Sequence, residues 1–450
     1  MQTNFAPDRL EDPQLKSSEK ILRTCVHCGF CTATCPTYLL LGDELDSPRG
    51  RIYLIKDMLE SGKPATREVV THVDRCLSCL SCMTTCPSGV HYMHLVDHAR
   101  SYINQTYRRP WTDRAMRSLL AFVLPHPNRF RLAMLGAMIG KPFKPLLKAI
   151  PAVGHRLAAM VDLAPAGLPS RSPLEGPRVL PAPGPRKGRV AILSGCAQTV
   201  LAPGINEAAI RILNRHGVEV VLPKGEGCCG ALVHHMGEEN RSHAFAARNI
   251  DAWMREIEGE GLDAILVTAS GCGTTVKDYG FMFRDVPAYA AKAARVSALA
   301  KDVTEYLATL ELEPARRTGE TVAYHSACSL QHGQQIRDEP KTLLKRMGFV
   351  VKDVPEGHIC CGSAGVYNVL QPEIAGALQQ RKIENISRTR PALIAAGNIG
   401  CMTQIENGLR KRGSDLPIVH TVELLDWATG GPLPEKLVER GFRDREILEH

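Results

Sequence analysis

Two cysteine runs of the same spacing constrain this chain more than any other feature. Each has the form Cys-x-x-Cys-x-x-Cys-x-x-x-Cys-Pro, which is typical of domains with two [4Fe–4S] clusters, where the fourth cysteine of each run ligates the other cluster. The short gaps let three thiolates of one loop bind one cluster, whereas the longer gap and the proline turn the fourth thiolate away. The first run comprises Cys25, Cys28, Cys31 and Cys35, and the second comprises Cys76, Cys79, Cys82 and Cys86.

This exchange predicts the ligands of two [4Fe–4S] clusters that lie close together. Structural zinc is the alternative, because Cys-x-x-Cys pairs also bind zinc. Zinc sites combine two separated pairs rather than a triple with a distant fourth ligand, so iron–sulfur clusters are favoured. We predict that Cys25, Cys28, Cys31 and Cys86 bind the first cluster, and that Cys76, Cys79, Cys82 and Cys35 bind the second.

Length and composition agree with cofactor-binding thiols. The chain has 450 residues and 16 cysteines, and its N-terminal segment lacks the basic-then-apolar pattern of a signal peptide. We therefore expect a cytoplasmic protein whose cysteines serve metals or redox chemistry rather than disulfides. Its 44% hydrophobic and 23% charged residues are ordinary for a globular protein of two or three domains.

The second half of the chain contains an internal repeat built around cysteines. Three cysteines recur after 132 residues and a fourth recurs after 129, a regularity that is hard to assign to chance. In each copy they follow short apolar runs that alternate with helical patterns, which predicts parallel α/β sheets with thiols at the carboxyl ends of the strands. The first copy holds Cys196, Cys228, Cys229 and Cys272, and the second holds Cys328, Cys360, Cys361 and Cys401.

Each group of four thiols is enough for a further iron–sulfur cluster or metal, or for redox chemistry. Glycines such as Gly227 and Gly230 beside the paired cysteines let the backbone approach a ligand, which favours such a role over buried, unligated thiols. Four neighbouring histidines have no fixed spacing to a partner, and we interpret them as satisfied core or surface residues. They are His234, His235, His325 and His332.

Composition divides the chain into five segments. Prolines are expected to break residues 101–160 into short helices, and residues 161–188, which hold seven prolines, are expected to form an extended linker. A helix is predicted from Pro48 to Leu59, where Arg49 and Arg51 either neutralise cluster charge or bind a carboxylate, or else lie on a solvated face. The segments are a polar, weakly structured lead-in (1–20), a two-cluster ferredoxin-type domain (21–100), a basic connector (101–188) and two cysteine-rich modules (189–316 and 317–450). The predicted strands are 190–193, 218–222, 264–268, 322–324, 349–354 and 392–396, and the predicted module helices are 205–215 and 335–347.

The connector carries the positive charge of the chain. Between Arg100 and Arg189 there are sixteen Lys or Arg residues and three Asp or Glu residues, while the whole chain has a net charge of +8. Neither a helix-turn-helix pattern nor a zinc finger is evident, so we expect no nucleic-acid partner. A surface for an acidic protein partner is favoured, and an anionic membrane surface is the alternative.

With these residues in place, the sequence resembles the iron–sulfur subunits of bacterial glycolate oxidase (glycolate dehydrogenase). The resemblance is carried by the segments that begin at Cys25 (CVHCGFCTATCPTY), Leu41 (LGDELDSPRGRIY), Thr268 (TASGCG) and Cys360 (CCGSAG), and it is weakest over 101–188. It implies an α-helical ferredoxin domain with two [4Fe–4S] clusters, followed by two CCG-type cysteine-rich modules of the α/β class.

The resemblance also implies an electron-transfer subunit with no catalytic residue of its own. Two flavoprotein subunits that carry FAD would oxidise glycolate to glyoxylate, and this chain would pass the electrons toward a quinone-type acceptor. Peripheral contact with the cytoplasmic face of the inner membrane is left open.

Two other functions are weighed against this one. The first is a catalytic CCG subunit of a disulfide- or quinone-reducing complex, of the heterodisulfide reductase or anaerobic glycerol-3-phosphate dehydrogenase type. CCG modules of heterodisulfide reductases often end in Cys-x-x-Cys, whereas Thr275 and Gln404 stand at the last position here, which argues against disulfide reduction. The second is a zinc-bound interaction protein.

Overall fold

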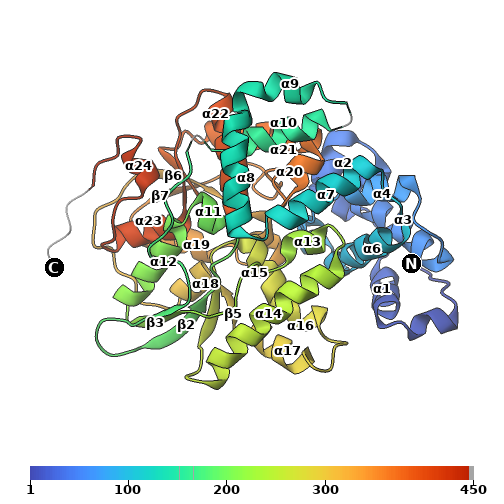
Figure 1. The fold of residues 1–450 in the computed structure, drawn as a ribbon, viewed down its shortest axis with the longest axis horizontal. Coiled ribbons are helices and arrows are strands. Elements are labelled where there is room, and N and C mark those ends of the chain that lie inside the picture. Colours follow the sequence, from blue (N-terminus) through green and yellow to red (C-terminus); the bar gives the residue numbers. More distant parts are fainter. Residues whose placement is uncertain (152, 166, 445–450) are drawn as a thin grey trace.

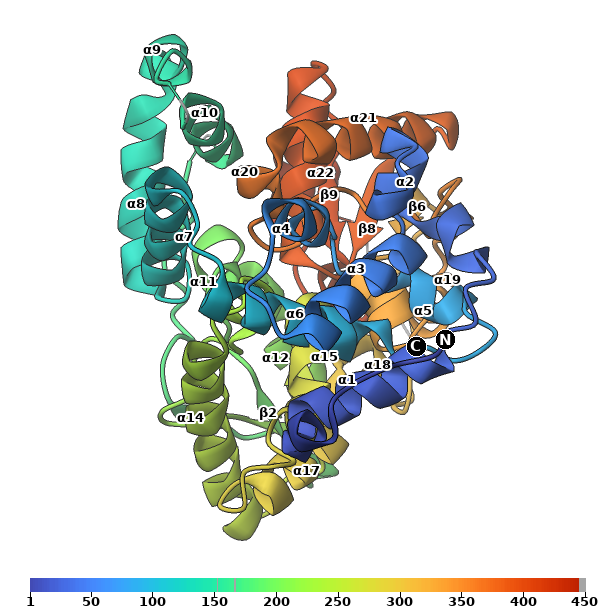
Figure 2. The ribbon, with the colours of Figure 1, turned by 90° about the vertical axis from the view of Figure 1, so that its right-hand side faces the viewer.

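The computed structural model describes residues 1–151, 153–165 and 167–444. A helical N-terminal region lies beside two α/β modules (Figure 1), and the connector helices stand along one side of the molecule in the turned view (Figure 2). Turning the view shows the N-terminal helices next to the second module, where α2 (Pro36–Leu41) contacts α21 (Pro372–Arg388) (Figure 2). The fold therefore brings the N-terminal region, which carries both cysteine runs, close to the second copy of the repeat.

The N-terminal region consists of short helices joined by the two cysteine loops. Helix α1 (Pro13–Thr24) begins at Asp12, whose carboxylate accepts hydrogen bonds from the backbone N–H groups of Gln14 and Leu15. Because this cap starts a helix with a buried apolar side, the expectation that 1–20 is weakly structured is wrong. The other elements are η1 (Pro7–Glu11), η2 (Phe30–Thr34), η3 (Glu44–Asp46), α3 (Pro48–Ser61), α4 (Arg67–Asp74), α5 (Ser81–Thr85) and α6 (Tyr92–Thr106).

Helix α3 confirms the helix predicted to begin at Pro48. The Ser47 hydroxyl accepts a hydrogen bond from the backbone N–H of Gly50 at 3.0 Å, and the proline occupies the first turn, where its missing N–H costs nothing. One side of the helix is buried and includes Ile52 and Arg51. The same helix therefore contributes both to the core and, through Arg51, to the surroundings of the cysteines.

Prolines divide the connector into the short helices that the sequence predicts. Pro127 starts one helix and Pro145 lies in the first turn of another. The expectation of an extended linker over 161–188 is wrong at both ends, because a helix continues to Leu163 and a short strand pairs antiparallel with the first module. The elements are α7 (Trp111–Val123), α8 (Pro127–Gly140), η4 (Lys141–Phe143), α9 (Lys144–Lys148), α10 (Gly154–Leu163) and β1 (Arg178–Leu180).

Each module is built on its own sheet, with the order β1-β3-β2-β4-β5 in the first and β7-β6-β8-β9 in the second. All neighbouring strands are parallel except β1 and β3, so the predicted repeat of parallel α/β modules is confirmed. The strands are β2 (Gly188–Ile192), β3 (Val218–Leu222), β4 (Ala264–Val267), β5 (Ala300–Asp302), β6 (Thr321–His325), β7 (Val350–Asp353), β8 (Leu393–Ala396) and β9 (Ile418–His420).

Helices cover these sheets and complete the repeat. The helix predicted over 335–347 begins later, at Glu339, because Gln335 has a left-handed backbone (φ 60°) and Pro340 lies in the first turn. The first module has α11 (Gln198–Leu201), α12 (Gly204–Arg215), α13 (Ala231–His235), α14 (Glu239–Glu258), α15 (Ser270–Lys277), α16 (Tyr279–Met282), α17 (Ala290–Leu299) and α18 (Val303–Leu307). The second has the short π-helix η5 (Ser329–Gly333), α19 (Glu339–Arg346), α20 (Tyr367–Leu370), α21, α22 (Ile399–Lys411), α23 (Thr421–Ala428) and α24 (Glu435–Val438).

The two modules share one hydrophobic core. Side chains of both sheets, such as Val190 and Val322, belong to the same buried cluster. Helix α12 packs on α23, and its Arg211 and Arg215 both pair with the buried carboxylate of Asp426. The modules are therefore joined by apolar packing and by a buried ionic contact. Within the described residues, every helix is too short or too polar to cross a bilayer.

Candidate metal sites

The first set of predicted ligands lines one hollow in the N-terminal region. Cys25, Cys28, Cys31 and Cys86 all line it, so the fourth cysteine of the second run lies with the first three of the first run. Cys28 is exposed and Cys25 is buried, so the hollow opens toward the surface on the Cys28 side. The structure thus brings together the residues that the exchange of ligands requires.

A second hollow lies next to the first and is lined by the other predicted set. Cys76, Cys79 and Cys82 line it together with Cys35, the fourth cysteine of the first run. All four are buried, and burial raises the pKa values of Cys79 and Cys82 well above the usual range of a thiol. Cys82 lines both hollows, so they are adjacent. Ionisation of Cys79 and Cys82 at neutral pH therefore requires a cation beside them.

The two cysteine loops have the same backbone conformation. His27 and Gly29 lie in the left-handed region at φ 55° and 89°, and Ser78 and Leu80, which occupy the same places in the second run, do so at 49° and 61°. Such residues coil a loop tightly and turn successive thiols toward one point. A non-glycine residue in this region is strained, so Leu80 indicates that the tight loop is required.

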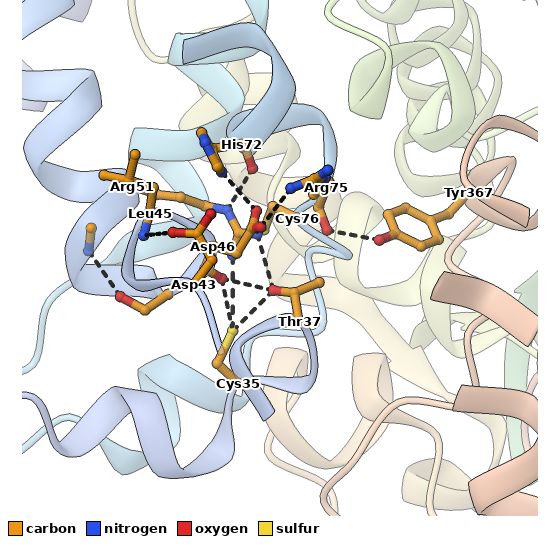
Figure 3. Close-up of polar contacts among 12 residues, drawn as sticks. Cys35, Thr37, Asp43, Leu45, Asp46, Arg51, His72, Arg75, Cys76 and Tyr367 are labelled. Carbon is orange, nitrogen blue, oxygen red and sulfur yellow. Dashed lines mark hydrogen bonds and ion pairs between the residues drawn. The ribbon is translucent and has the colours of Figure 1, made fainter. Parts of the chain in front are cut away.

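Arg51 is the cation nearest the second hollow. It is 1% exposed, and its guanidinium lies 3.8 Å from Cys35 Sγ and 3.3 Å from a carboxylate oxygen of Asp46 (Figure 3). Burial lowers the pKa of Arg51, but the neighbouring charges of Cys76, Tyr92 and Cys35 outweigh it and raise the pKa overall. The solvated-face alternative is therefore wrong for Arg51, which both binds a carboxylate and adds positive charge beside the thiols.

Asp46 holds this group of side chains together. Its two oxygens accept hydrogen bonds from Arg51, from Arg75 at 2.8 Å and from His72 at 3.0 Å (Figure 3). With three basic partners, this carboxylate is satisfied as a structural anion. Arg49 differs from Arg51, because it is partly exposed and pairs with Glu44 at the surface.

In the first module the four thiols form a continuous group. Cys228 contacts both Cys196 and Cys229, and Cys229 contacts Cys272. The turn that carries the pair depends on Gly230, whose backbone is left-handed (φ 85°) and where a Cβ would lie 3.0 Å from the carbonyl of Ser242. Hydrogen bonding to the neighbouring thiol and burial both raise the pKa of Cys196, so a thiolate there requires a cation.

In the second module the thiols also form a group, and a histidine joins them. Cys328 Sγ and Cys360 Sγ are 3.9 Å apart, and Cys360 contacts Cys361. The ligand atoms of His325, Cys361 and Cys401 all lie within 4.8 Å of one another, and all three residues are buried. The structure therefore brings together all four predicted cysteines of this copy, with a nitrogen donor beside two of them.

The interpretation of the histidines as satisfied residues holds for His332 and His234. His332 hydrogen-bonds to Thr84 Oγ1 at 2.7 Å, and His234 pairs with the carboxylate of Asp97 at 3.3 Å. His235 lies near the same carboxylate, but its Nδ1 has no hydrogen-bond partner among the described residues. For His325 it is wrong, because neither ring nitrogen has a hydrogen-bond partner among the described residues. A sequence signal existed: the matching position of the first copy, 132 residues earlier, is the apolar Leu193.

The second hollow and the second module share an interface. Leu77 and Cys79 pack in one apolar cluster with Ile359 and Cys360, and Tyr367 donates a hydrogen bond to the carbonyl of Arg75 at 2.8 Å. Two thiols of the first module face the connector instead, where Cys196 and Cys228 pack with Met116 and Leu120. The two copies of the repeat therefore have different neighbours.

Comparison with known proteins identifies both halves of the chain. Residues 21–90 match the family described as a 4Fe-4S dicluster domain, and residues 190–277 and 322–406 match the cysteine-rich domain named CCG. A hypothetical protein from Helicobacter pylori has a similar fold, with a TM-score of 0.54 at 9% identity, over 98% of this chain and 76% of that one.

Two relatives match along nearly the whole chain. The glycolate oxidase iron-sulfur subunit of Escherichia coli (strain K12) is 42% identical over 95% of this chain and 99% of its own length. The probable glycolate oxidase iron-sulfur subunit of Bacillus subtilis (strain 168) is 32% identical over 92% and 96%. The chain therefore belongs to the family of glycolate oxidase iron–sulfur subunits.

Proposed function

We propose that this chain is the electron-transfer subunit of a glycolate (2-hydroxyacid) dehydrogenase complex. The observation that carries the proposal is the pair of adjacent cysteine-lined hollows, which share Cys82. Two [4Fe–4S] clusters bound there would supply one-electron carriers in close succession. The choice of glycolate as substrate rests on the names of the two full-length relatives.

The ligands follow the exchange between the two runs. The hollow lined by Cys25, Cys28, Cys31 and Cys86 would hold the first cluster, and the hollow lined by Cys76, Cys79, Cys82 and Cys35 the second. Arg51 would offset part of the negative charge of the second site, because its guanidinium lies 3.8 Å from Cys35 Sγ. The donor sets therefore fit two cubane clusters.

Electrons would enter on the Cys28 side of the molecule. Cys28 is exposed, and the apolar side chains of Val26, Phe30 and Tyr53 around it are 66%, 64% and 58% exposed. A partner that covers these side chains would gain apolar contact and bring its own cofactor close to the first site. We propose that this partner is one of two flavoprotein subunits that carry FAD. The final electron acceptor would be a quinone.

The connector offers a second surface for the complex. Helices α7, α8 and α9 leave large apolar side chains exposed among basic ones, including Trp111 at 73% and Ile139 at 74%. We favour an acidic protein partner here over anionic lipid, because the subunit must dock on the chain that supplies its electrons. Flotation of the purified complex with anionic vesicles tests this choice. Flotation that is lost on charge reversal of Arg129, Arg131, Lys141 and Lys144, with the subunits still associated, would contradict it.

A disulfide- or quinone-reducing catalytic subunit is less well supported. In the second module a Cys-x-x-Cys motif that begins at Cys401 would end at residue 404, which is a glutamine. Gln404 is 3% exposed and accepts a hydrogen bond from Asn368 at 3.1 Å. Gln404 is thus part of the packing and not a redox group. The first module has the buried Thr275 at the same place.

Anaerobic co-purification tests the proposed function most directly. We expect the tagged chain to retain flavin-containing subunits and about eight irons, as two cubane clusters require, and the complex to reduce a dye when glycolate is added. A chain that carries zinc and no iron, or that binds no flavoprotein, would refute the proposal.

A further inference from the structure

We propose that the second module binds a single divalent metal ion of the zinc type through His325, Cys361 and Cys401. The ligand atoms of these three residues lie within 4.8 Å of one another in a fully buried place. This site is separate from the two cluster sites and does not depend on the proposed electron-transfer function.

The histidine is the first reason for this assignment. His325 is 1% exposed and neither ring nitrogen has a hydrogen-bond partner among the described residues. A buried polar group without a partner costs about 1–3 kcal/mol, so such groups are rare unless a ligand satisfies them. A metal ion bound to one ring nitrogen would remove part of this cost, and imidazole with thiolates is a preferred donor set of zinc.

The spacing of the sulfurs is the second reason. Thiolates that share one tetrahedral zinc ion at about 2.3 Å lie about 3.8 Å from each other. The sulfurs of Cys361 and Cys401 and a ring nitrogen of His325 all lie within 4.8 Å of one another, close to this spacing. These three side chains would fill three of the four tetrahedral positions. The cysteines of the N-terminal loops, by contrast, surround hollows.

The charge of the surroundings is the third reason. Lys382 is 1% exposed, lies close to Cys360, Cys361 and Cys401, and donates a hydrogen bond to the carbonyl of Glu356 at 3.0 Å. A buried ammonium group beside these sulfurs stabilises their negatively charged form, which is the form in which thiols bind a metal ion.

The position of the site explains what the ion would do. His325 ends strand β6, Cys361 follows β7, and Cys401 lies in the first turn of α22. The ion would tie these three segments together at the carboxyl end of the sheet. It would also fix Cys360 and Ile359, which pack against Cys79 of the second hollow. The ion thus serves as a structural support for the interface with the electron-transfer region.

The test is metal analysis of the full-length chain purified under anaerobic conditions. We expect about one zinc per chain besides the iron, with an X-ray absorption spectrum that contains both sulfur at about 2.3 Å and nitrogen at about 2.0 Å. His325→Leu gives the second module the residue that the first has, and we expect it to lose this zinc and keep its iron. The matched control is His332→Leu, which removes a buried histidine that is already hydrogen-bonded, and it should keep both metals.

Three results would overturn the proposal. They are wild-type protein without zinc, zinc bound by sulfur alone, and an unchanged zinc content and spectrum in His325→Leu. If that variant does not fold, the wild-type spectrum decides, because it lacks a nitrogen shell when His325 is not a ligand. Full iron content without zinc would refute the zinc site and leave the electron-transfer function standing.

Discussion

The N-terminal loops and the two modules each contain eight cysteines but arrange them in opposite ways. In the loops the thiols line hollows, whereas in the modules the sulfurs contact one another. A cluster inserts iron and sulfide between its ligands and so needs room, while a single ion draws its ligands together. If the sites are occupied as we propose, the spacing of the thiols alone separates the electron carriers from the structural metal ion.

The largest effect is expected from a ligand of the buried hollow. Cys79→Ala removes a predicted ligand of the second cluster and leaves a gap where metal binding supports folding. We expect loss of cluster iron, measured by mass spectrometry, and loss of glycolate-dependent dye reduction by the complex. Cys272→Ala in the first module is the control, and it should retain both clusters. A wild-type iron content in Cys79→Ala would contradict the proposal that the loop cysteines, and not the module cysteines, bind the clusters.

The exchange of ligands between the loops gives a sharper test of the same distinction. Cys35 lines the second hollow although it belongs to the first run. We therefore expect Cys35→Ser to alter the electron paramagnetic resonance signal of the cluster bound by the second run. Cys86→Ser should alter the signal of the other cluster. Damage confined to the cluster of the substituted run would contradict the exchange.

Arg51 tests whether buried charge is specific to the cluster region. Arg51→Met leaves Asp46 with one partner fewer and removes the cation beside Cys35. Breaking a buried ion pair costs about 3–5 kcal/mol, which should appear in the urea midpoint followed through cluster absorbance. The second cluster should also become harder to reduce. The control Arg49→Met removes a solvent-screened surface pair, and its urea midpoint should stay close to that of the wild type.

Much of this architecture is predictable from sequence, because spacing and periodicity report local chemistry. The cysteine runs predict which thiols share each hollow, and the 132-residue repeat predicts the two parallel sheets. The helix in the lead-in over 1–20 is not predictable in the same way, because it depends on one cap at Asp12 and on burial of a few apolar side chains.

Long-range contacts are what sequence reasoning could not supply. His325 lies near Cys361 and Cys401 only after the strands align. The pairing of β1 with β3 likewise depends on the sheet that is already formed, since the segment before it is rich in proline. A difference between the two copies, His325 in the second against Leu193 in the first, is the sequence signal for the proposed metal site.

The smallest effect concerns the contact that joins the two kinds of region. Tyr367 of the second module donates a hydrogen bond to the carbonyl of Arg75, just before the second cysteine run, and its ring packs beside Cys79. Tyr367→Phe keeps the ring and removes only the hydroxyl, so we expect a loss of about 0.5–1.5 kcal/mol in unfolding free energy. Tyr53→Phe, at an exposed position, is the control and should stay within about 0.5 kcal/mol of the wild type. If this contact joins the two regions, Tyr367→Phe should lose its cluster absorbance at a lower urea concentration than the wild type. The midpoint followed by far-ultraviolet circular dichroism, which reports mainly on the larger modules, should shift less. Equal shifts for both probes would mean that loops and modules unfold as one unit, and that the contrast between them is chemical and not mechanical.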